Sequence, residues 1–154
     1  MAIIVTGSVA AGKTTVAKMI AKKLKWKYVD VTKLVREEEL SEGYDSERDS
    51  AIVDVKKLNQ VLVKMIKKNP ELVIDSHMSH YLDPKYVDFC VVVKCDVELL
   101  KERLAERGYD LGKIQENVDA ELFDVCLNEA LEHGHHVVVV KSPDVDLSFL
   151  EKLA

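Results

Sequence analysis

A glycine-rich loop, set between a strand-like run and a helix-like segment, constrains the fold of this chain more than any other feature. Residues 7–14 read GSVAAGKT and fit the pattern G-x-x-x-x-G-K-[ST]. Residues 2–6 ahead of the loop are largely apolar and of strand length, whereas apolar residues in 15–24 recur at the spacing of one helix face. A strand, a glycine loop and a helix in this order point backbone N–H groups and the positive end of a helix at one anion. The sequence therefore predicts a phosphate-binding loop in an α/β protein.

The residue types within this loop suit a bound nucleotide. Gly7 and Gly12 permit backbone torsions that a Cβ atom disfavours, so the loop can wrap closely around a phosphate. Lys13 supplies a positive charge for the β- and γ-phosphates, and the hydroxyl of Thr14 can ligate Mg²⁺. The motif predicts nucleotide binding but does not say what happens to the nucleotide.

Composition restricts the class of protein. A chain of 154 residues with 47% apolar and 32% charged residues is typical of one soluble globular domain. The net charge of −5 argues against a broad basic surface for nucleic acid, although it leaves a local basic patch open. No apolar run approaches the ~20 residues that span a bilayer, and no signal peptide fits before the first strand. The three cysteines form no C-x-x-C pair, so we expect a reducing, cytoplasmic compartment and no membrane partner.

Predicted strands and helices alternate along the chain. After the first strand, further strands are expected at 26–30, 71–75, 88–94 and 135–141, and helices at 31–42, 55–68, 96–107, 111–133 and 145–153, with a loop at 43–49. Thr32 and Asp54 are the candidate N-caps of the helices at 31–42 and 55–68. Five short strands separated by helices predict a single α/β domain over 1–154, a three-layer α/β/α P-loop NTPase fold with a five-stranded parallel sheet. Its ligand should lie beyond the carboxyl ends of the strands.

An acidic residue and a histidine follow the apolar strand at 71–75. Asp75 ends this strand, where a carboxylate can hold Mg²⁺ directly or through water, and it joins Thr14 as the candidate metal ligand. His77 lies two residues on, where an imidazole can position water or accept a proton. His80 is interpreted mainly as a polar loop residue.

Arginines occur at two further places that could meet phosphate. Arg107, beside Gly108 and Tyr109, is the main candidate for neutralising the transferring phosphoryl group, with Arg103 as a weaker one. Arg36, at the head of an acidic run, lies after the second strand, where small-molecule P-loop kinases hold the phosphate acceptor. The alternative interpretations are a helix C-terminus with favourable charge for Arg107 and a solvated helix face for Arg36.

Together these segments resemble one family. The resemblance rests on 7–15, Arg36-Glu37-Glu38, Gly43-Tyr44-Asp45, Asp75-Ser76-His77 and Arg107-Gly108-Tyr109, and it covers nearly the whole chain. It is to the adenylate kinase isoenzyme 6 type, the atypical adenylate kinase that doubles as a small-subunit ribosome-assembly ATPase. One departure is visible, because Val9-Ala10-Ala11 stands where the family more commonly has Pro-Gly-x. Ala10 must therefore aim its N–H at phosphate without the freedom of glycine.

The resemblance implies an activity and a set of site residues. It implies reversible transfer from ATP to AMP with Mg²⁺, a slower ATPase activity, a small-subunit ribosomal protein as partner, and a role in rRNA processing through at most indirect rRNA contact. Residues from 30 to about 53 would form an NMP-binding region, and those from about 106 to 116 a short lid. ATP would contact Ala10, Gly12, Lys13, Thr14, Thr15 and Arg107. Arg36 would contact AMP, and His77 would serve phosphoryl transfer or ATP hydrolysis, with Lys13 and Arg107 as the other catalytic residues.

Two other functions remain open on the sequence alone. The same scaffold could phosphorylate another small metabolite, such as shikimate or a nucleoside, with the acidic run after Arg36 lining a different acceptor pocket. The chain could also be a nucleotide-switched assembly factor whose kinase activity is incidental. The cluster His133-Gly134-His135-His136 is interpreted as a helix end and a strand start rather than a metal site. The segment 141–143 after the last strand is a candidate neighbour of the adenine.

Overall fold

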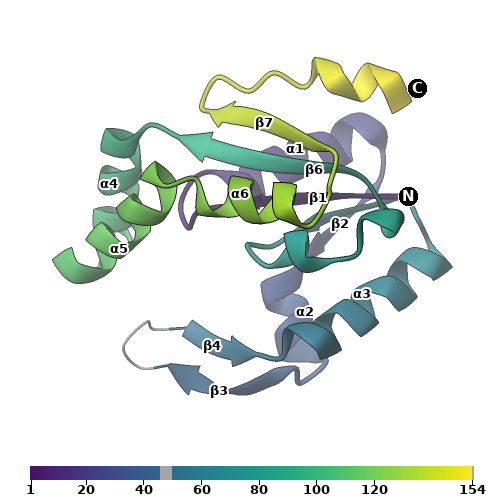
Figure 1. The fold of residues 1–154 in the computed structure, drawn as a ribbon, viewed down its shortest axis with the longest axis horizontal. Helices are drawn as coiled ribbons and strands as arrows, with labels where there is room; N and C mark the ends of the chain where they lie inside the picture. Colours follow the sequence, from purple (N-terminus) through teal and green to yellow (C-terminus); the bar gives the residue numbers. More distant parts are fainter. Residues whose placement is uncertain (46–49, 154) are drawn as a thin grey trace.

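Five parallel strands form the centre of the protein. The computed structural model describes residues 1–45 and 50–153. The sheet has the order β2-β5-β1-β6-β7, and every neighbouring pair in it is parallel (Figure 1). Its strands are β1 (Ala2–Gly7), β2 (Lys27–Asp30), β5 (Leu72–Asp75), β6 (Val87–Cys95) and β7 (Val137–Ser142). The predicted five-stranded parallel sheet is confirmed.

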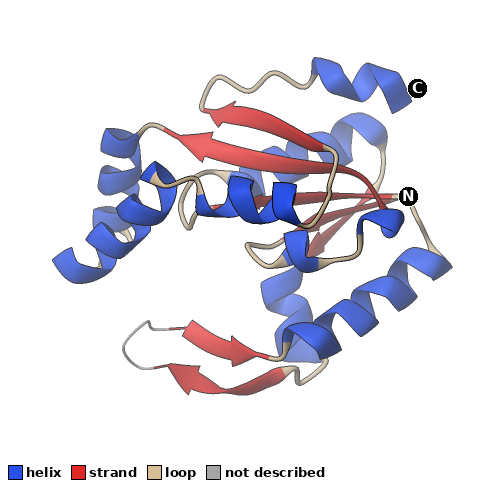
Figure 2. Cartoon of the chain, viewed as in Figure 1, coloured by secondary structure: helices blue, strands red, loops and turns tan. Residues whose placement is uncertain are grey.

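Helices cover both faces of this sheet, which completes the predicted α/β/α layering (Figure 2). The α-helices are α1 (Lys13–Leu24), α2 (Val31–Glu37), α3 (Val55–Lys68), α4 (Val97–Glu106), α5 (Leu111–Leu122) and α6 (Val125–Glu132). Three 3-10 helices complete the set: η1 (Ser79–Tyr81), η2 (Pro84–Tyr86) and η3 (Ser148–Leu153). The helix expected at 145–153 is thus a 3-10 helix that begins only at Ser148. Among the described residues, the helices are all too short or too polar to cross a membrane.

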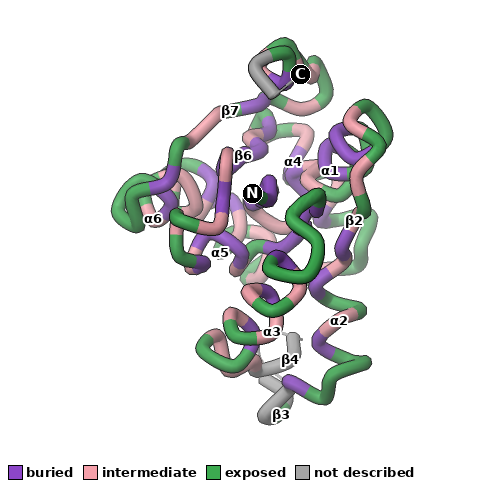
Figure 3. Tube along the Cα trace, turned by 90° about the vertical axis from the view of Figure 1, so that its right-hand side faces the viewer, coloured by how far each residue is buried: buried purple, intermediate pink, exposed green. Residues whose placement is uncertain are grey.

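The alternation of side chains along β1 divides the core in two. Ile3 and Val5 are fully buried against α1 and α4, whereas Ala2 and Ile4 are fully buried against α3 and the neighbouring α6. Burial on both faces explains why β1 reads as a continuous apolar run. Along the chain trace, buried residues gather at the centre of the molecule and exposed ones on its outer turns (Figure 3). The β6 cysteines, Cys90 and Cys95, belong to opposite halves of the core, as their odd separation predicts.

The segment after β2 departs from its predicted form. The helix expected at 31–42 ends at Glu37, and an antiparallel hairpin of β3 (Ser41–Asp45) and β4 (Ser50–Val53) follows it. The helix ends early because Glu39 takes a left-handed backbone (φ 52°), which lets Leu40 donate its N–H to the carbonyl of Val35 and bury its side chain. The predicted loop at 43–49 is therefore wrong over 43–45, and 46–49 lie outside the described residues. Helix α2 and the hairpin project away from the main sheet together with α3 (Figure 1).

Of the two predicted N-caps, one is confirmed and the other is wrong. Asp54 caps α3 as predicted, with its carboxylate accepting from the N–H of Lys56 at 2.9 Å. Helix α2 is capped by Asp30 rather than Thr32, because the Asp30 carboxylate accepts the N–H of Thr32 itself at 2.9 Å. Asp30 ends β2 directly beside the helix, so the strand delivers the cap.

The single helix expected at 111–133 is two helices. Helix α5 ends at Leu122, and α6 begins at Val125 after Asp124 takes a left-handed backbone (φ 52°). Aspartate tolerates this conformation better than most residues. Lys94 on β6 holds the junction, since its ammonium donates to the Glu121 carbonyl and pairs with the Glu121 and Asp124 carboxylates.

Candidate active site

The backbone of the phosphate-binding loop is fixed by close packing. A Cβ atom on Gly7 would stand 2.7 Å from the carbonyl oxygen of Val93, so only glycine fits there. Gly12 (φ 101°) leads directly into α1. Ala10 takes a left-handed backbone (φ 65°), the conformation that glycine would adopt more easily. The loop therefore reaches a glycine-like shape at Ala10 despite the departure from the family pattern.

This loop forms one wall of a cavity of about 490 Å³ at the carboxyl end of the sheet. The side of the loop toward the cavity contributes Ala10, Gly12, Lys13, Thr14 and Thr15. Arg103 and Arg107 line the same cavity, as do Ser142 and Pro143. The structure thus brings the six candidate ATP contacts together, with the segment after β7 beside them.

Arg103 is anchored within this cavity. Its guanidinium donates to the carbonyl oxygen of Ala10 at 3.1 Å and to the hydroxyl of Ser142 at 3.4 Å. Arg107 caps the end of α4 and is exposed. Arg103 therefore supports the shape of the loop, whereas the exposed Arg107 side chain can turn toward a ligand.

Thr14 and Asp75 meet as the sequence predicts. The Thr14 hydroxyl donates to Oδ2 of Asp75 at 2.8 Å, and the Tyr28 hydroxyl donates to the same oxygen at 2.6 Å. Burial and the neighbouring Asp75 raise the pKa of Tyr28. Oδ1 of Asp75 is buried and has no hydrogen-bond partner among the described residues. A hydroxyl beside a carboxylate with one unused oxygen suits an oxygen-seeking cation such as Mg²⁺.

His77 lies on the other side of the phosphate-binding loop. It lines a smaller cavity of about 220 Å³ with Gly7, Ser8 and Val9. Desolvation of the ring lowers the pKa of His77, and the positive charge of Lys13 lowers it further. A neutral imidazole close to Lys13 can accept a proton or orient water at neutral pH.

Of the remaining candidates, Arg36 and the histidines at 133–136 lie outside the 490 Å³ cavity, whereas the expected lid reaches it through Glu106 and Arg107. Arg36 is exposed in the last turn of α2. The expected lid at about 106–116 spans the end of α4 and the first half of α5, with Gly108 (φ 81°) between them and Lys113 over the Tyr109 ring at 4.2 Å. Helix α6 ends at Glu132, with His133 as its C-cap and Gly134 (φ 83°) directly after it, and β7 begins at Val137.

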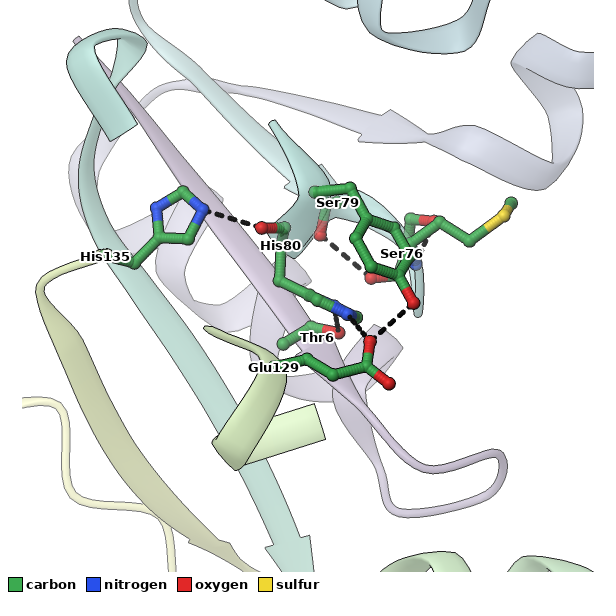
Figure 4. Close-up of polar contacts among 8 residues, drawn as sticks. Thr6, Ser76, Ser79, His80, Glu129 and His135 are labelled. Atoms are coloured by element: carbon green, nitrogen blue, oxygen red, sulfur yellow. Dashed lines mark hydrogen bonds and ion pairs between the residues drawn. The ribbon is translucent and has the colours of Figure 1, made fainter. Parts of the chain in front are cut away.

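His80 is a buried, hydrogen-bonded residue rather than the polar loop residue that the sequence predicted. Its ring is almost fully buried, with Nδ1 3.0 Å from the Thr6 hydroxyl and Nε2 2.7 Å from the Glu129 carboxylate (Figure 4). Neither partner was a candidate in the sequence, nor was Tyr28. Only a polar residue closing an otherwise apolar strand, as Thr6 does, hints at such a contact.

Comparison with known proteins identifies the family. The family model described as an AAA domain matches residues 3–124. A Methanocaldococcus jannaschii protein named "Putative adenylate kinase" is 38% identical over 130 residues, which are 84% of this chain and 72% of that protein. The adenylate kinase isoenzyme 6 homolog FAP7 of Saccharomyces cerevisiae is 36% identical over 92% of this chain and 73% of its own length. The Dictyostelium discoideum adenylate kinase isoenzyme 6 homolog is 32% identical over 94% and 82%.

Solved structures share the fold at lower identity. The YorR protein of Bacillus subtilis matches with a TM-score of 0.64 and 19% identity, covering 99% of this chain and 96% of that one. Shikimate kinase from Acinetobacter baumannii matches with a TM-score of 0.60 and 17% identity over 99% and 87%. Such identities establish the fold alone, whereas the sequence relatives establish more: the chain belongs to the adenylate kinase isoenzyme 6 family of P-loop kinases.

Proposed function

We propose that this protein is an adenylate kinase-type phosphotransferase that converts ATP and AMP to two ADP with Mg²⁺ and also hydrolyses ATP slowly. The observation that carries the proposal is the single cavity shared by the phosphate-binding loop, Arg103, Arg107 and the segment after β7. Family membership supports the same activity, because its relatives are named adenylate kinases.

The donor nucleotide would lie in the 490 Å³ cavity. Backbone N–H groups of the loop and the start of α1 would hold the phosphates, and Lys13 would neutralise the β- and γ-phosphates. Arg107 would swing onto the transferring group, where fixed positive charge stabilises charge on the equatorial oxygens. Ser142 and Pro143 line the same cavity and would lie near the base.

Thr14 and Asp75 would hold Mg²⁺, which supplies Lewis-acid stabilisation of the phosphate oxygens when bound. Tyr28 already donates to Oδ2 of Asp75, so this hydroxyl orients the carboxylate and leaves Oδ1 for the cation. His77 would stand at the reacting end of the loop, neutral and able to accept a proton or orient water.

AMP would bind between the core and the lobe formed by α2, the hairpin and α3. The α2 and hairpin part of this lobe corresponds to the proposed NMP-binding region at 30–53. Arg36 would grip its phosphate through the guanidinium fork. Because Arg36 is exposed and outside the donor cavity, this lobe would have to close over the core for transfer, together with the lid at 106–116. Closure would exclude water and align the two nucleotides.

Coupled measurement of ATP turnover with and without AMP tests this proposal. We expect AMP-dependent formation of two ADP, abolished in Lys13→Ala. His77→Ala should retain ATP binding but lose activity, and Arg36→Ala should raise the KM for AMP and leave that for ATP unchanged. Turnover at the wild-type level in Lys13→Ala would disprove the assignment of the site.

An assembly ATPase is the second candidate function. His77, which lines a cavity with Gly7, Ser8 and Val9 of the phosphate-binding loop, favours it, because an imidazole there could orient a water molecule against the γ-phosphate. In that case the partner would be a small-subunit ribosomal protein in the cytoplasm, and nucleotide hydrolysis would release it. ATP hydrolysis that is indifferent to AMP and stimulated by ribosomal particles would favour this function over nucleotide interconversion.

A further inference from the structure

A buried polar relay joins the strand before the phosphate-binding loop to helix α6. It consists of Thr6, His80 and Glu129, with Thr6 and His80 buried to at least 98%. The Thr6 hydroxyl is 3.0 Å from Nδ1 of His80, and Nε2 of His80 is 2.7 Å from Oε2 of Glu129 (Figure 4). The Tyr81 hydroxyl donates to the same Glu129 oxygen. Three elements far apart in sequence therefore meet at one imidazole.

The hydrogen bonds assign a direction to this relay. Although burial opposes it, hydrogen bonds from Tyr81 and His80 hold the pKa of Glu129 below its usual range, so its carboxylate accepts. Burial lowers the pKa of His80 despite Glu129, so the ring is neutral at pH 7. Nε2–H of His80 then donates to Glu129, and Nδ1 must accept from Thr6. Each ring nitrogen has one partner of the right kind, which is what makes burial of an imidazole tolerable.

The same loop is attached to β1 by further bonds. The N–H of Ser76 donates to the carbonyl of Val5 at 3.1 Å, and the hydroxyl of Ser79 donates to the carbonyls of Ser76 and Val5. The carbonyl of His80 accepts from Nε2 of His135 at 2.8 Å. The ends of the segment 76–80 are therefore held on both sides of His77.

His77 itself has no such support. Its ring makes no hydrogen bond within the described part of the chain. The position of its imidazole relative to Lys13 thus depends on the backbone on either side. Ser76 fixes that backbone on one side and His80 on the other.

We propose that Thr6, His80 and Glu129 are positioning residues that set where His77 stands relative to Lys13 and the phosphate-binding loop. This inference rests on the proposed phosphotransferase function, in which His77 acts at the transferring group. Without the relay, the segment 76–80 is still attached to β1 through Ser76 and Ser79, but its end at His80 can move. Displacement of a reacting group by about 1 Å costs on the order of 100-fold in rate, whereas ATP binding in the other cavity stays intact.

Substitutions at Thr6 isolate the hydroxyl. Thr6→Val keeps the shape of the side chain and removes the donor, whereas Thr6→Ser keeps the donor and removes a methyl group. We expect Thr6→Val to lower kcat between about tenfold and 100-fold with the KM for ATP changed less than twofold, and Thr6→Ser to retain most of the activity. Glu129→Gln should lower kcat in the same way. The double variant Thr6→Val/Glu129→Gln should be little worse than either single variant, because both break one relay.

A spectroscopic measurement separates positioning from stability and from the proposed function. The ring resonances of His77, assigned by comparison with His77→Gln, should shift in Thr6→Val and Glu129→Gln but not in Glu121→Gln, which perturbs another buried carboxylate. Glu121→Gln should lower stability and leave kcat of the folded protein within twofold. If the wild-type protein is inactive but the His77 resonances shift in the variants, the phosphotransferase function is disproved and the positioning role of the relay is still supported. Two results with an active wild-type protein would disprove the proposed positioning role. In the first, Thr6→Val keeps its kcat and its His77 resonances. In the second, Thr6→Val and Thr6→Ser lower kcat equally.

Discussion

At the scale of single residues, two glycines with unusual backbones separate steric from torsional demands. Gly7 (φ 156°) faces the carbonyl of Val93, whereas a Cβ on Gly108 (φ 81°) would meet nothing within 4 Å. Gly7→Ala should therefore lower the free energy of unfolding by about 3 kcal/mol or more, since it adds a backbone clash to any torsional strain. Gly108→Ala should cost only about 1 kcal/mol, the torsional part alone.

Urea unfolding of both variants, monitored by circular dichroism, measures the difference. Equal losses would contradict the view that packing against Val93 rather than torsion fixes the loop. Because Gly108 lies in the proposed lid, the activity of the Gly108→Ala protein should also be compared with that of the wild type at a temperature where both are folded.

Where a local motif carried a site residue, the sequence was enough to name that residue as a candidate, and its role stays a prediction. The phosphate-binding loop, Asp75 and Arg107 all adjoin the expected region, because strand ends of a parallel sheet converge on one edge. Prediction from the sequence failed where contacts join residues that are far apart along the chain. The hydroxyl of Tyr28 reaches Asp75 across 47 positions, His80 reaches Thr6 across 74, and Arg103 reaches Ala10 across 93. No spacing rule along the chain reports such pairs.

At the scale of elements, the break between α5 and α6 shows why helix boundaries were harder. Apolar residues continue at helical spacing through the junction, so periodicity alone predicts one helix. A tertiary contact ends α5, because the ammonium of Lys94 on β6 donates a hydrogen bond to the Glu121 carbonyl at 2.7 Å. The hairpin after α2 was missed for a related reason, since the early end of α2 depends on Leu40 finding a place in the core.

Lys94 should therefore contribute strongly to stability. Its ammonium pairs with the buried carboxylate of Glu121 and with Asp124, so Lys94→Met would leave Glu121 buried without its cation. We expect a loss of about 3 kcal/mol, measured by denaturant unfolding at pH 7. Lys94→Met/Glu121→Leu should recover part of the loss, because it removes the stranded charge. A double variant no more stable than Lys94→Met would contradict this.

The pH dependence of this pair follows from the pKa of Lys94. Although burial opposes it, hydrogen bonds to Asp124 and Glu121 raise the pKa of Lys94 above its ordinary 10.5. The folded state thus holds the proton more tightly than the unfolded state. The stabilisation is complete below pH 10.5 and is lost as the pH rises through the higher folded value. The difference in stability between wild type and Lys94→Met should accordingly shrink in strongly alkaline buffer, where the Lys94 ammonium loses its proton.

The cap of α3 gives a smaller effect on the same scale. Asp54→Ala removes the acceptor for the N–H groups of Lys56 and Lys57, which should cost about 1 kcal/mol. Asp54→Asn keeps an acceptor and should cost less than half as much. Thermal unfolding of the three proteins would show the order, and an equal loss in Asn and Ala variants would mean that charge rather than capping matters there.

At the scale of the whole molecule, the lobe of α2, the hairpin and α3 differs from the sheet that carries the donor site. Within the described residues, β3 and β4 pair only with each other, whereas β1 is flanked by β5 and β6 and fully buried. Elements with fewer buried contacts open more readily. Amide hydrogens of β3 and β4 should therefore exchange with deuterium faster than those of β1 in the free protein.

Bound nucleotides should change this difference in exchange rate, and the change would reveal whether the lobe closes over the core. If AMP binds between this lobe and the core, AMP together with a non-hydrolysable ATP analogue should slow exchange across 31–45 and 106–116, because binding adds free energy to the closed state only. The ATP analogue alone should protect the loop at 7–15 and leave β3 unchanged. Lys13→Ala, which should weaken donor binding, serves as the control and should lose both effects. Protection limited to the loop with both nucleotides present would place the acceptor elsewhere and remove Arg36 from the proposed site.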